Sequence, residues 1–219
     1  MRRLFGPFEH DISNLYRAIF IDLDDWVATI LRWAPDARMV LEVGCGEGAM
    51  TERLCAAYPN ADITAIDVTP RLGRLFRGDR SRVRFVLEPV GEIAGRHAGA
   101  FDLVVLSDVL HHVPIALRGS LLSDARETLA PGGRFIFKEW VKDRGIIHWA
   151  AEASDRYLTG DDVAYMMRPE ARSLVETQFG AEAIQDEHHI GPWRNNLALL
   201  VCPDGQATSL GTRLVERDT

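Results

Sequence analysis

The 219-residue sequence has few cysteines, no excess of basic residues and no long apolar run. Its three cysteines form no CxxC pair, which argues against a disulfide scaffold or a structural zinc site and favours a reducing compartment. The formal net charge of −7 argues against a general nucleic-acid binder, because binding phosphates requires a basic face. With no signal-peptide pattern and no apolar run of membrane-spanning length, the sequence predicts a cytoplasmic protein without a membrane partner.

Apolar residues make up 47% of the chain, which is enough for one core of ordinary size. The length suits one α/β domain with additions at its ends. We expect an N-terminal helical cap over residues 1–37, a main domain over 38–203 and a polar C-terminal tail over 204–219. Residues 143–180 of the main domain are expected to be mainly helical and to form a lid.

Short apolar runs alternate with helical patterns along the main domain. Strands are predicted at residues 38–43, 62–67, 82–87, 101–107, 132–140, 183–190 and 194–202. Helices are predicted at 11–34, with a break near Asp22, and at 51–58, 70–77 and 115–129. The alternation is typical of a parallel sheet, and the short turn at Gly191 and Pro192 permits only antiparallel pairing. We therefore predict a doubly wound, mostly parallel seven-stranded α/β sheet with a terminal antiparallel hairpin and N-terminal helices.

A glycine-rich loop stands where the first predicted strand meets its helix. Gly44 and Gly46 allow a tight turn and a close approach of the backbone to a ligand. The helix that follows offers free N–H groups to an anion. Gly44, Gly46 and Ala49 also satisfy the G-x-G-x-x-G/A pattern, so this loop alone indicates either S-adenosylmethionine or a dinucleotide. Cys45, inside the loop, is interpreted as a small filler.

Asp67 ends the second predicted strand, 25 residues after Glu42 (67 − 42). A carboxylate at this place can accept hydrogen bonds from both hydroxyls of a ribose. Adenosine is common to both ligand classes, so Asp67 supports an adenosine ligand without separating them. Nearby, Arg71, Arg74 and Arg77 recur at i, i+3 spacing in the predicted helix 70–77, and we interpret them as a solvated face.

Four motifs in order resemble those of the class I S-adenosylmethionine-dependent methyltransferases. They are residues 42–48, residues 65–68, residues 101–113 and residues 129–135. The predicted terminal hairpin fits the same family, and dinucleotide-binding sheets lack it. The resemblance covers residues 38–202 and identifies 38–203 as an S-adenosylmethionine-binding domain.

The resemblance assigns roles to residues at the strand ends. It implies that Glu42 and the backbone of Gly44, Cys45 and Gly46 hold the amino-acid end of S-adenosylmethionine. Asp67 would hold the ribose, and Val68 would pack on the adenine. The family usually has an acidic pair near the adenine amine, for which Glu88 substitutes here, and Ser107 and Asp108 would line the pocket.

Methyl transfer to a hydroxyl or an acidic carbon is helped by a base. His111 and His112 follow the fourth predicted strand, and His111 is our first choice for this base because imidazole titrates near neutral pH. We predict no metal site. The alternative is a divalent-cation site formed by Asp108 with His188, His189 or Asn195.

The sequence predicts a methyltransferase for an oxygen, nitrogen or carbon atom of a small molecule. A homodimer is compatible with this prediction, and nucleic acid is not an expected partner. Three other interpretations stay open at this point. They are a dinucleotide-dependent oxidoreductase, an S-adenosylmethionine-binding module or cyclase without methyl transfer, and a methyltransferase acting on protein or RNA.

Overall fold

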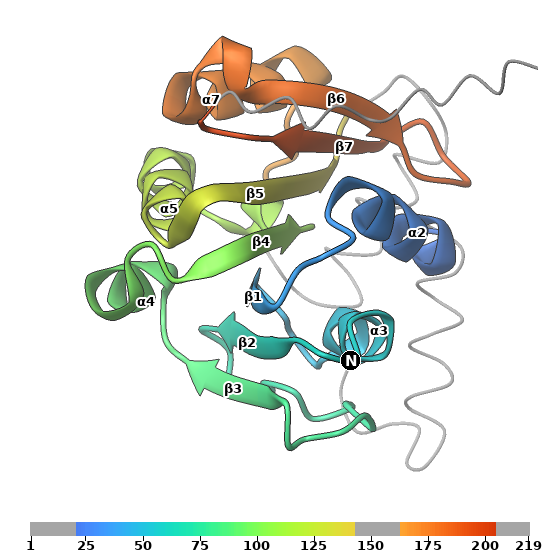
Figure 1. Cartoon of the computed structure of the whole chain (residues 1–219). Coiled ribbons are helices and arrows are strands. Elements are labelled where there is room, and N and C mark those ends of the chain that lie inside the picture. The colour runs from blue at the N-terminus through green and yellow to red at the C-terminus, as the bar shows by residue number, and fades with distance from the viewer. Residues whose placement is uncertain (1–20, 143–162, 205–219) are drawn as a thin grey trace, which may run out of the picture.

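The computed structural model describes residues 21–142 and 163–204, and it contains one seven-stranded sheet (Figure 1). The strand order is β3-β2-β1-β4-β5-β7-β6. The strands are β1 (Met39–Val43), β2 (Asp62–Asp67), β3 (Val83–Leu87), β4 (Phe101–Ser107), β5 (Leu129–Trp140), β6 (Ile184–His189) and β7 (Asn196–Val201). The first five strands pair in parallel, and β7 lies antiparallel to both β5 and β6. The predicted sheet and its terminal hairpin are confirmed.

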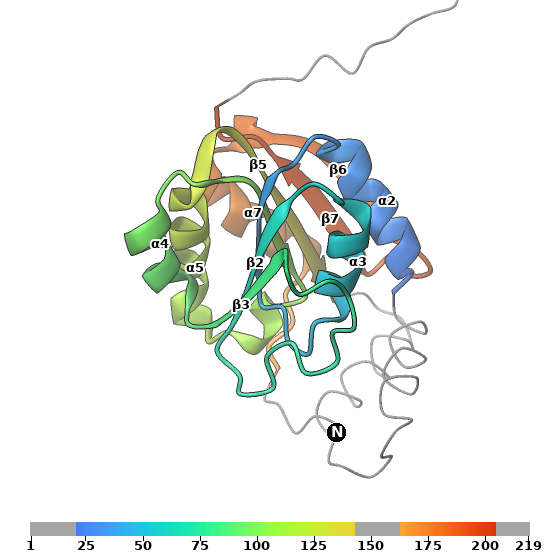
Figure 2. The ribbon, with the colours of Figure 1, turned by 60° about the horizontal axis from the view of Figure 1, so that its bottom comes forward.

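Helices cover both faces of this sheet (Figure 2). One face carries α2 (Leu23–Trp33) and α3 (Ala49–Ala57), and the other carries α4 (Val90–His97), α5 (Ile115–Glu127) and α7 (Arg168–Phe179). Two short 3-10 helices, η2 (Leu110–His112) and η4 (Ala181–Ala183), complete the described elements. The doubly wound arrangement follows from strands that are apolar on both faces, because each face must be covered to exclude water.

The core consists of one apolar layer on each side of the sheet. Trp26 and Ile30 of α2 are fully buried in the first layer, and Leu122 of α5 and Val175 of α7 are fully buried in the second. Asp22 caps α2 by accepting the N–H groups of residues 24 and 25, so a helix begins next to Asp22, and the earlier part of the predicted helix 11–34 lies outside the described residues.

One helix prediction was wrong, and one helix was missed. Residues 70–75 form turns and residues 76–77 have no regular structure, because Gly73 has a positive φ of 59° and the ring of Phe85 fills the space where a Cβ of residue 73 would lie. Arg71, Arg74 and Arg77 are exposed, as predicted, although they do not lie on a helix. The sequence analysis also missed α4, a short helix that contains two glycines and is held by burial of Val90 and Ile93 against the sheet.

The predicted lid is described only from residue 163 onwards. Residues 163–167 are not helical, Met167 pairs with Lys142 in an isolated parallel bridge, and α7 follows them. The predictions for residues 1–20, 143–162 and 205–219 lie outside the described residues. Within the described ranges, no helix combines the length and apolarity needed to cross a membrane.

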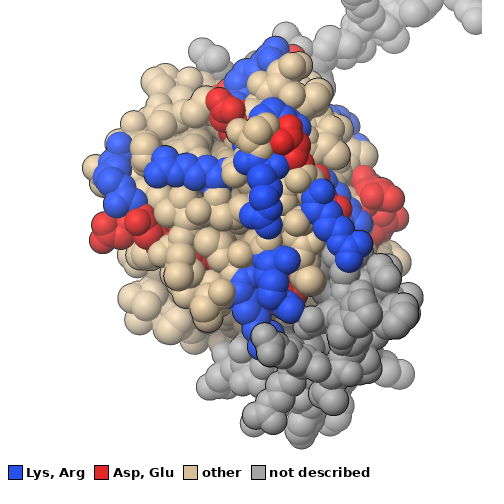
Figure 3. Space-filling model, turned by 90° about the horizontal axis from the view of Figure 1, so that it is seen from below, with Lys and Arg blue, Asp and Glu red and all other residues tan. Residues whose placement is uncertain are grey.

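The β3 edge of the sheet carries much of the positive charge (Figure 3). Exposed arginines on β3 and the preceding turns are Arg71, Arg74, Arg77, Arg80 and Arg84. Glu47 lies 2.7 Å from the guanidinium of Arg74 and 4.0 Å from that of Arg71. Figure 3 shows acidic side chains interspersed with the basic ones, which is typical of a solvated face.

Candidate functional site

The predicted site residues come together along the carboxyl ends of the parallel strands, where ligands of open α/β sheets bind. They lie at the end of β1 and its loop, at the ends of β2, β3 and β4, and on η2: Glu42, Gly44, Cys45, Gly46, Asp67, Val68, Glu88, Ser107, Asp108, His111 and His112. Strand order explains this gathering, because β1 lies between β2 and β4.

The glycine-rich loop is anchored to β2. The N–H groups of Gly44 and Cys45 both donate to the carbonyl of Ile66, at 2.8 and 3.0 Å. Gly44 has a φ of 77°, and a Cβ at this residue would lie 2.3 Å from Cγ2 of Val109. Only glycine fits there, so the loop and the segment after β4 pack against each other closely.

Asp67 joins the loop to the end of β2. One carboxylate oxygen accepts the N–H of Gly46 at 2.7 Å, and the other accepts the N–H of Thr69 at 2.8 Å. Beside Asp67, Val68 is 70% exposed, and Leu87 at the end of β3 is 55% exposed. Large apolar side chains exposed together with a fixed carboxylate provide a surface for a partly apolar ligand such as a nucleoside.

Glu42 is a buried carboxyl group beneath the glycine-rich loop. Its Oε2 atom has no hydrogen-bond partner among the described residues. Burial raises the pKa of Glu42 to about 7, the charge of Asp67 also raises it, and the Thr51 hydroxyl opposes both effects. A buried polar atom without a partner is unusual and indicates a place for a ligand group or a water molecule.

The surroundings of two other predicted cofactor residues, Glu88 and Cys45, are also described. The carboxylate of Glu88 forms an ion pair with Arg96 of α4. Burial and the nearby carboxylates of Glu42 and Asp67 raise the pKa of the Cys45 thiol far above its usual range. A thiol in this environment is a poor nucleophile, which supports the interpretation of Cys45 as a filler.

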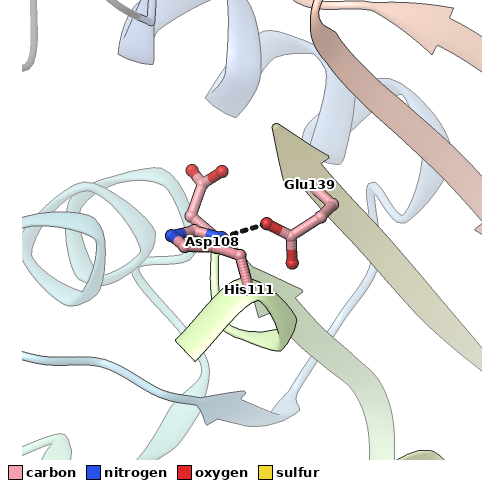
Figure 4. Close-up of side chains that lie close together, drawn as sticks. All are labelled: Asp108, His111 and Glu139. Atoms are coloured by element: carbon pink, nitrogen blue, oxygen red, sulfur yellow. Dashed lines mark hydrogen bonds and ion pairs between the residues drawn. The ribbon is translucent and has the colours of Figure 1, made fainter. Parts of the chain in front are cut away.

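His111 forms a buried pair with Glu139 of β5 (Figure 4). The imidazole Nδ1 contacts one carboxylate oxygen of Glu139, and the other oxygen accepts the N–H of Leu110 at 2.8 Å. A carboxylate in this position accepts the proton of Nδ1, so Nε2 is the nitrogen with a lone pair for proton transfer. The exposed ring of His112 lies 4.1 Å from that of His111, centroid to centroid.

Asp108, His111 and Glu139 are close enough to hold a metal ion together. However, the ammonium of Lys138 lies 2.7 and 2.6 Å from the two carboxylate oxygens of Asp108, and Lys138 is buried. A fixed cation already neutralises this carboxylate, so the geometry favours a hydrogen-bonded base over a metal centre.

The alternative metal set of Asp108 with His188, His189 or Asn195 is not assembled in the described part of the chain. His189 lies against the guanidinium of Arg168 at 2.8 Å, and the amide of Asn195 donates to the carbonyl of Val141 at 2.8 Å. These polar groups therefore serve the packing of the β6–β7 hairpin.

Three residues of this site were not among the predicted site residues: Glu139, Lys138 and Tyr165. The ring of Tyr165 stacks on that of His111, with centroids 4.9 Å apart and planes 20° apart. One signal was available, because Lys138 and Glu139 interrupt an otherwise apolar buried strand. Charged residues in such a strand are rarely buried unless they are paired.

Known proteins that are similar to this chain include methyltransferases. Residues 41–135 match the model of a family described as a methyltransferase domain. A ubiquinone biosynthesis O-methyltransferase from Xanthomonas axonopodis pv. citri is 33% identical over 109 residues, covering 48% of this chain and 44% of that protein. A protein of the same name from Aromatoleum aromaticum is 33% identical over 138 residues, covering 61% and 53%. The chain thus spans about half the length of these curated relatives.

Solved structures share the fold. An O-methyltransferase family protein from Burkholderia thailandensis matches with a TM-score of 0.68 and 19% identity, covering 92% of this chain and 61% of that one. A 1,6-didemethyltoxoflavin-N1-methyltransferase from the same organism, solved with S-adenosylhomocysteine, matches with a TM-score of 0.60 and 21% identity, covering 90% and 83%.

Proposed function

We propose that this chain, which belongs to the class I S-adenosylmethionine-dependent methyltransferases, transfers a methyl group from S-adenosylmethionine to a hydroxyl oxygen of a small molecule. The observation that carries the proposal is the His111–Glu139 pair, which stands at the same sheet edge as the glycine-rich loop and Asp67. A hydroxyl acceptor must lose a proton during transfer, and an imidazole held by a carboxylate can take it.

The sheet edge fits the ligand. The unpartnered Oε2 of Glu42 and the backbone of residues 44–46 suit the amino-acid end of S-adenosylmethionine. Asp67 already accepts two N–H groups, but a carboxylate offers about four acceptor sites, so ribose hydroxyls can still bind. Val68 is proposed to pack on the adenine, because its exposed side chain would be covered there.

The remaining predicted residues complete this assignment. Ser107 ends β4 and Asp108 follows it, and both would line the side of the ligand that carries the methyl group. Glu88, at the end of β3, would lie beside the adenine, with Arg96 as its partner. The acceptor side would be formed by η2 and residues 163–167.

When bound, S-adenosylmethionine would supply a methyl group activated by its bond to a positively charged sulfur, and S-adenosylhomocysteine would be the leaving group of the in-line transfer. His111 accepts the acceptor's hydroxyl proton at Nε2. Glu139 fixes the ring tautomer through Nδ1 and stabilises the imidazolium that forms, while the N–H of Leu110 holds the second carboxylate oxygen. His112, exposed beside His111, is the second candidate for the base.

Calorimetric titration with S-adenosylmethionine and S-adenosylhomocysteine tests the cofactor. Asp67→Ala should weaken both affinities, whereas Asp62→Ala, at the opposite end of β2, should leave them unchanged. Equal affinities for the wild type and Asp67→Ala would remove the ribose assignment.

Transfer of labelled methyl from S-adenosylmethionine to panels of phenols, aliphatic alcohols and amines tests the reaction. His111→Gln should reduce kcat by roughly a hundredfold or more while S-adenosylmethionine still binds. His97→Gln, on α4, is the matched control and should be unaffected. Full activity of His111→Gln across the pH range would transfer the role to His112 or eliminate the base, and His112→Gln distinguishes these outcomes.

A further inference from the structure

Arg118 of α5 is a buried cation to which the proposed reaction assigns no role. The residue is 4% exposed. Its Nε donates to the carbonyl of Val113 at 3.0 Å, and its Nη2 donates to the carbonyl of Ala164 at 2.6 Å. No carboxylate of the described residues makes a hydrogen bond with Arg118, and burying a charge on two main-chain carbonyls is costly.

The two carbonyls belong to two chain segments that both adjoin His111, the proposed base. Val113 directly follows η2, which carries His111. Ala164 lies in residues 163–167, here called the strap, which leads into α7. The planar guanidinium presents donors in a fixed fork, so it can set the distance between two backbone segments more rigidly than an ammonium can.

The strap makes further contacts with the same turn. The N–H of Ala164 donates to the carbonyl of His111 at 2.8 Å. Next along the strap, Tyr165 stacks on the His111 ring and packs in a small cluster with Trp140. Beyond Tyr165, the backbone N–H of Lys142 donates to the carbonyl of Met166 at 2.7 Å. Ala164 is therefore bonded to η2 through its own N–H and to α5 through its carbonyl.

We infer that Arg118 is a positioning residue that clamps the strap against η2 and so holds His111 in its reactive orientation toward the acceptor. This inference rests on the proposed function for the role of His111, but the clamp itself can be measured without turnover. Arg118 does not touch the acceptor or the cofactor in this scheme. It acts through Val113 and Ala164 on the ring that does.

Electrostatics supports the same arrangement. Burial lowers the pKa of Arg118, while the charges of Glu139 and Glu170 oppose that effect. Arg118 therefore also lies within the electrostatic influence of the carboxylate that holds His111.

The test compares three variants of the full chain. Arg118→Met keeps the aliphatic stem and removes the fork, and Arg118→Lys keeps the charge with a single point donor. Arg126→Met is the matched control, because Arg126 lies on the same helix and also donates to a carbonyl, that of Gln178, at 2.8 Å. Urea unfolding and calorimetry with S-adenosylmethionine establish that each variant folds and binds the cofactor.

Two measurements do not require turnover. Hydrogen exchange of the Ala164 and Tyr165 amides reports the clamp, and we expect roughly tenfold faster exchange in Arg118→Met, an intermediate value in Arg118→Lys and no change in Arg126→Met. Nitrogen NMR of the His111 ring should show one tautomer in the wild type and Arg126→Met, and a mixture in Arg118→Met. Unchanged exchange and an unchanged tautomer would overturn the inference, even if the wild type methylates no acceptor in the panel.

Kinetics supplies the catalytic readout. We expect kcat/KM for the acceptor to fall roughly ten- to hundredfold in Arg118→Met, with partial rescue by Arg118→Lys and an unchanged affinity for S-adenosylmethionine. An equal loss of cofactor affinity would indicate general loosening and would overturn the positioning role. If Arg118→Met does not fold, Arg118→Lys decides the question by the same criteria. An active wild type with normal kinetics in both variants would refute the inference while leaving the proposed function intact.

Discussion

Replacing Glu42 with glutamine should stabilise the ligand-free protein at alkaline pH. Glu42 is 3% exposed on β1, and burial raises its pKa from an ordinary 4.5 to about 7. In the unfolded chain the same carboxyl ionises near its ordinary value. Between these two pKa values the folded protein therefore binds the proton that the unfolded chain releases.

This difference fixes the sign of the pH effect. Because the folded state binds more protons, the free energy of unfolding decreases as pH rises from about 4.5 to about 7, and it levels off above that range. One pKa unit corresponds to about 1.4 kcal/mol, so the difference between 4.5 and about 7 costs about 3.5 kcal/mol at pH 8. That is a large fraction of the roughly 5–15 kcal/mol that stabilises a typical domain.

Urea unfolding of the wild type and Glu42→Gln at pH 5 and pH 8 measures the effect. The glutamine variant cannot ionise, so the stability difference between the two proteins should move in its favour by about 2.5 kcal/mol between these pH values, because at pH 5 the unfolded chain is already largely ionised at Glu42. Glu182→Gln, at an exposed position on η4, should show no such change. Parallel pH dependences of the wild type and Glu42→Gln would refute the reasoning, because they would mean that Glu42 titrates alike in both states.

Three further outcomes are expected. A cationic ligand group near Glu42 should favour the ionised form of this carboxyl, so binding of S-adenosylmethionine near pH 6 should release close to one proton. Calorimetry in buffers of different ionisation enthalpy measures the number of protons released, and Glu42→Gln should abolish this release. Glu139→Gln should lower kcat by about a hundredfold or more and leave cofactor affinity unchanged; equal turnover would contradict the tautomer role. Gly44→Ala should cost about 1–3 kcal/mol in urea unfolding, because its Cβ would meet Val109; an unaltered midpoint would show that the loop can shift.

The cofactor side of the site could be predicted because its determinants are local in the sequence. A strand, a glycine-rich turn and a helix form one continuous segment, and Asp67 ends the next strand. The carboxyl ends of neighbouring parallel strands necessarily meet at one edge. Strand-end position therefore sufficed to group Gly44 with Asp67, and the sheet order confirms it.

Local pattern failed where tertiary packing decided the structure. Leu72, Leu75 and Phe76 have helical spacing, yet the contact between Gly73 and the Phe85 ring favours turns. Conversely, α4 contains Gly91 and Gly95, which have low helix propensity. Burial of Val90 and Ile93 on the sheet outweighs that propensity, and the competition between the two effects cannot be judged from the segment alone.

The base side of the site is built from contacts that are distant in sequence. His111 meets Glu139 across 28 positions, and Arg118 reaches Ala164 across 46. In sequence Arg118 is one more arginine on a helix, where the usual expectation is a solvated side chain. Only the fold shows that it is buried and bonded to the backbone carbonyls of Val113 and Ala164. A base assigned from sequence is thus a candidate side chain, and its partners and orientation follow from the packing of β5, α5 and the strap around it.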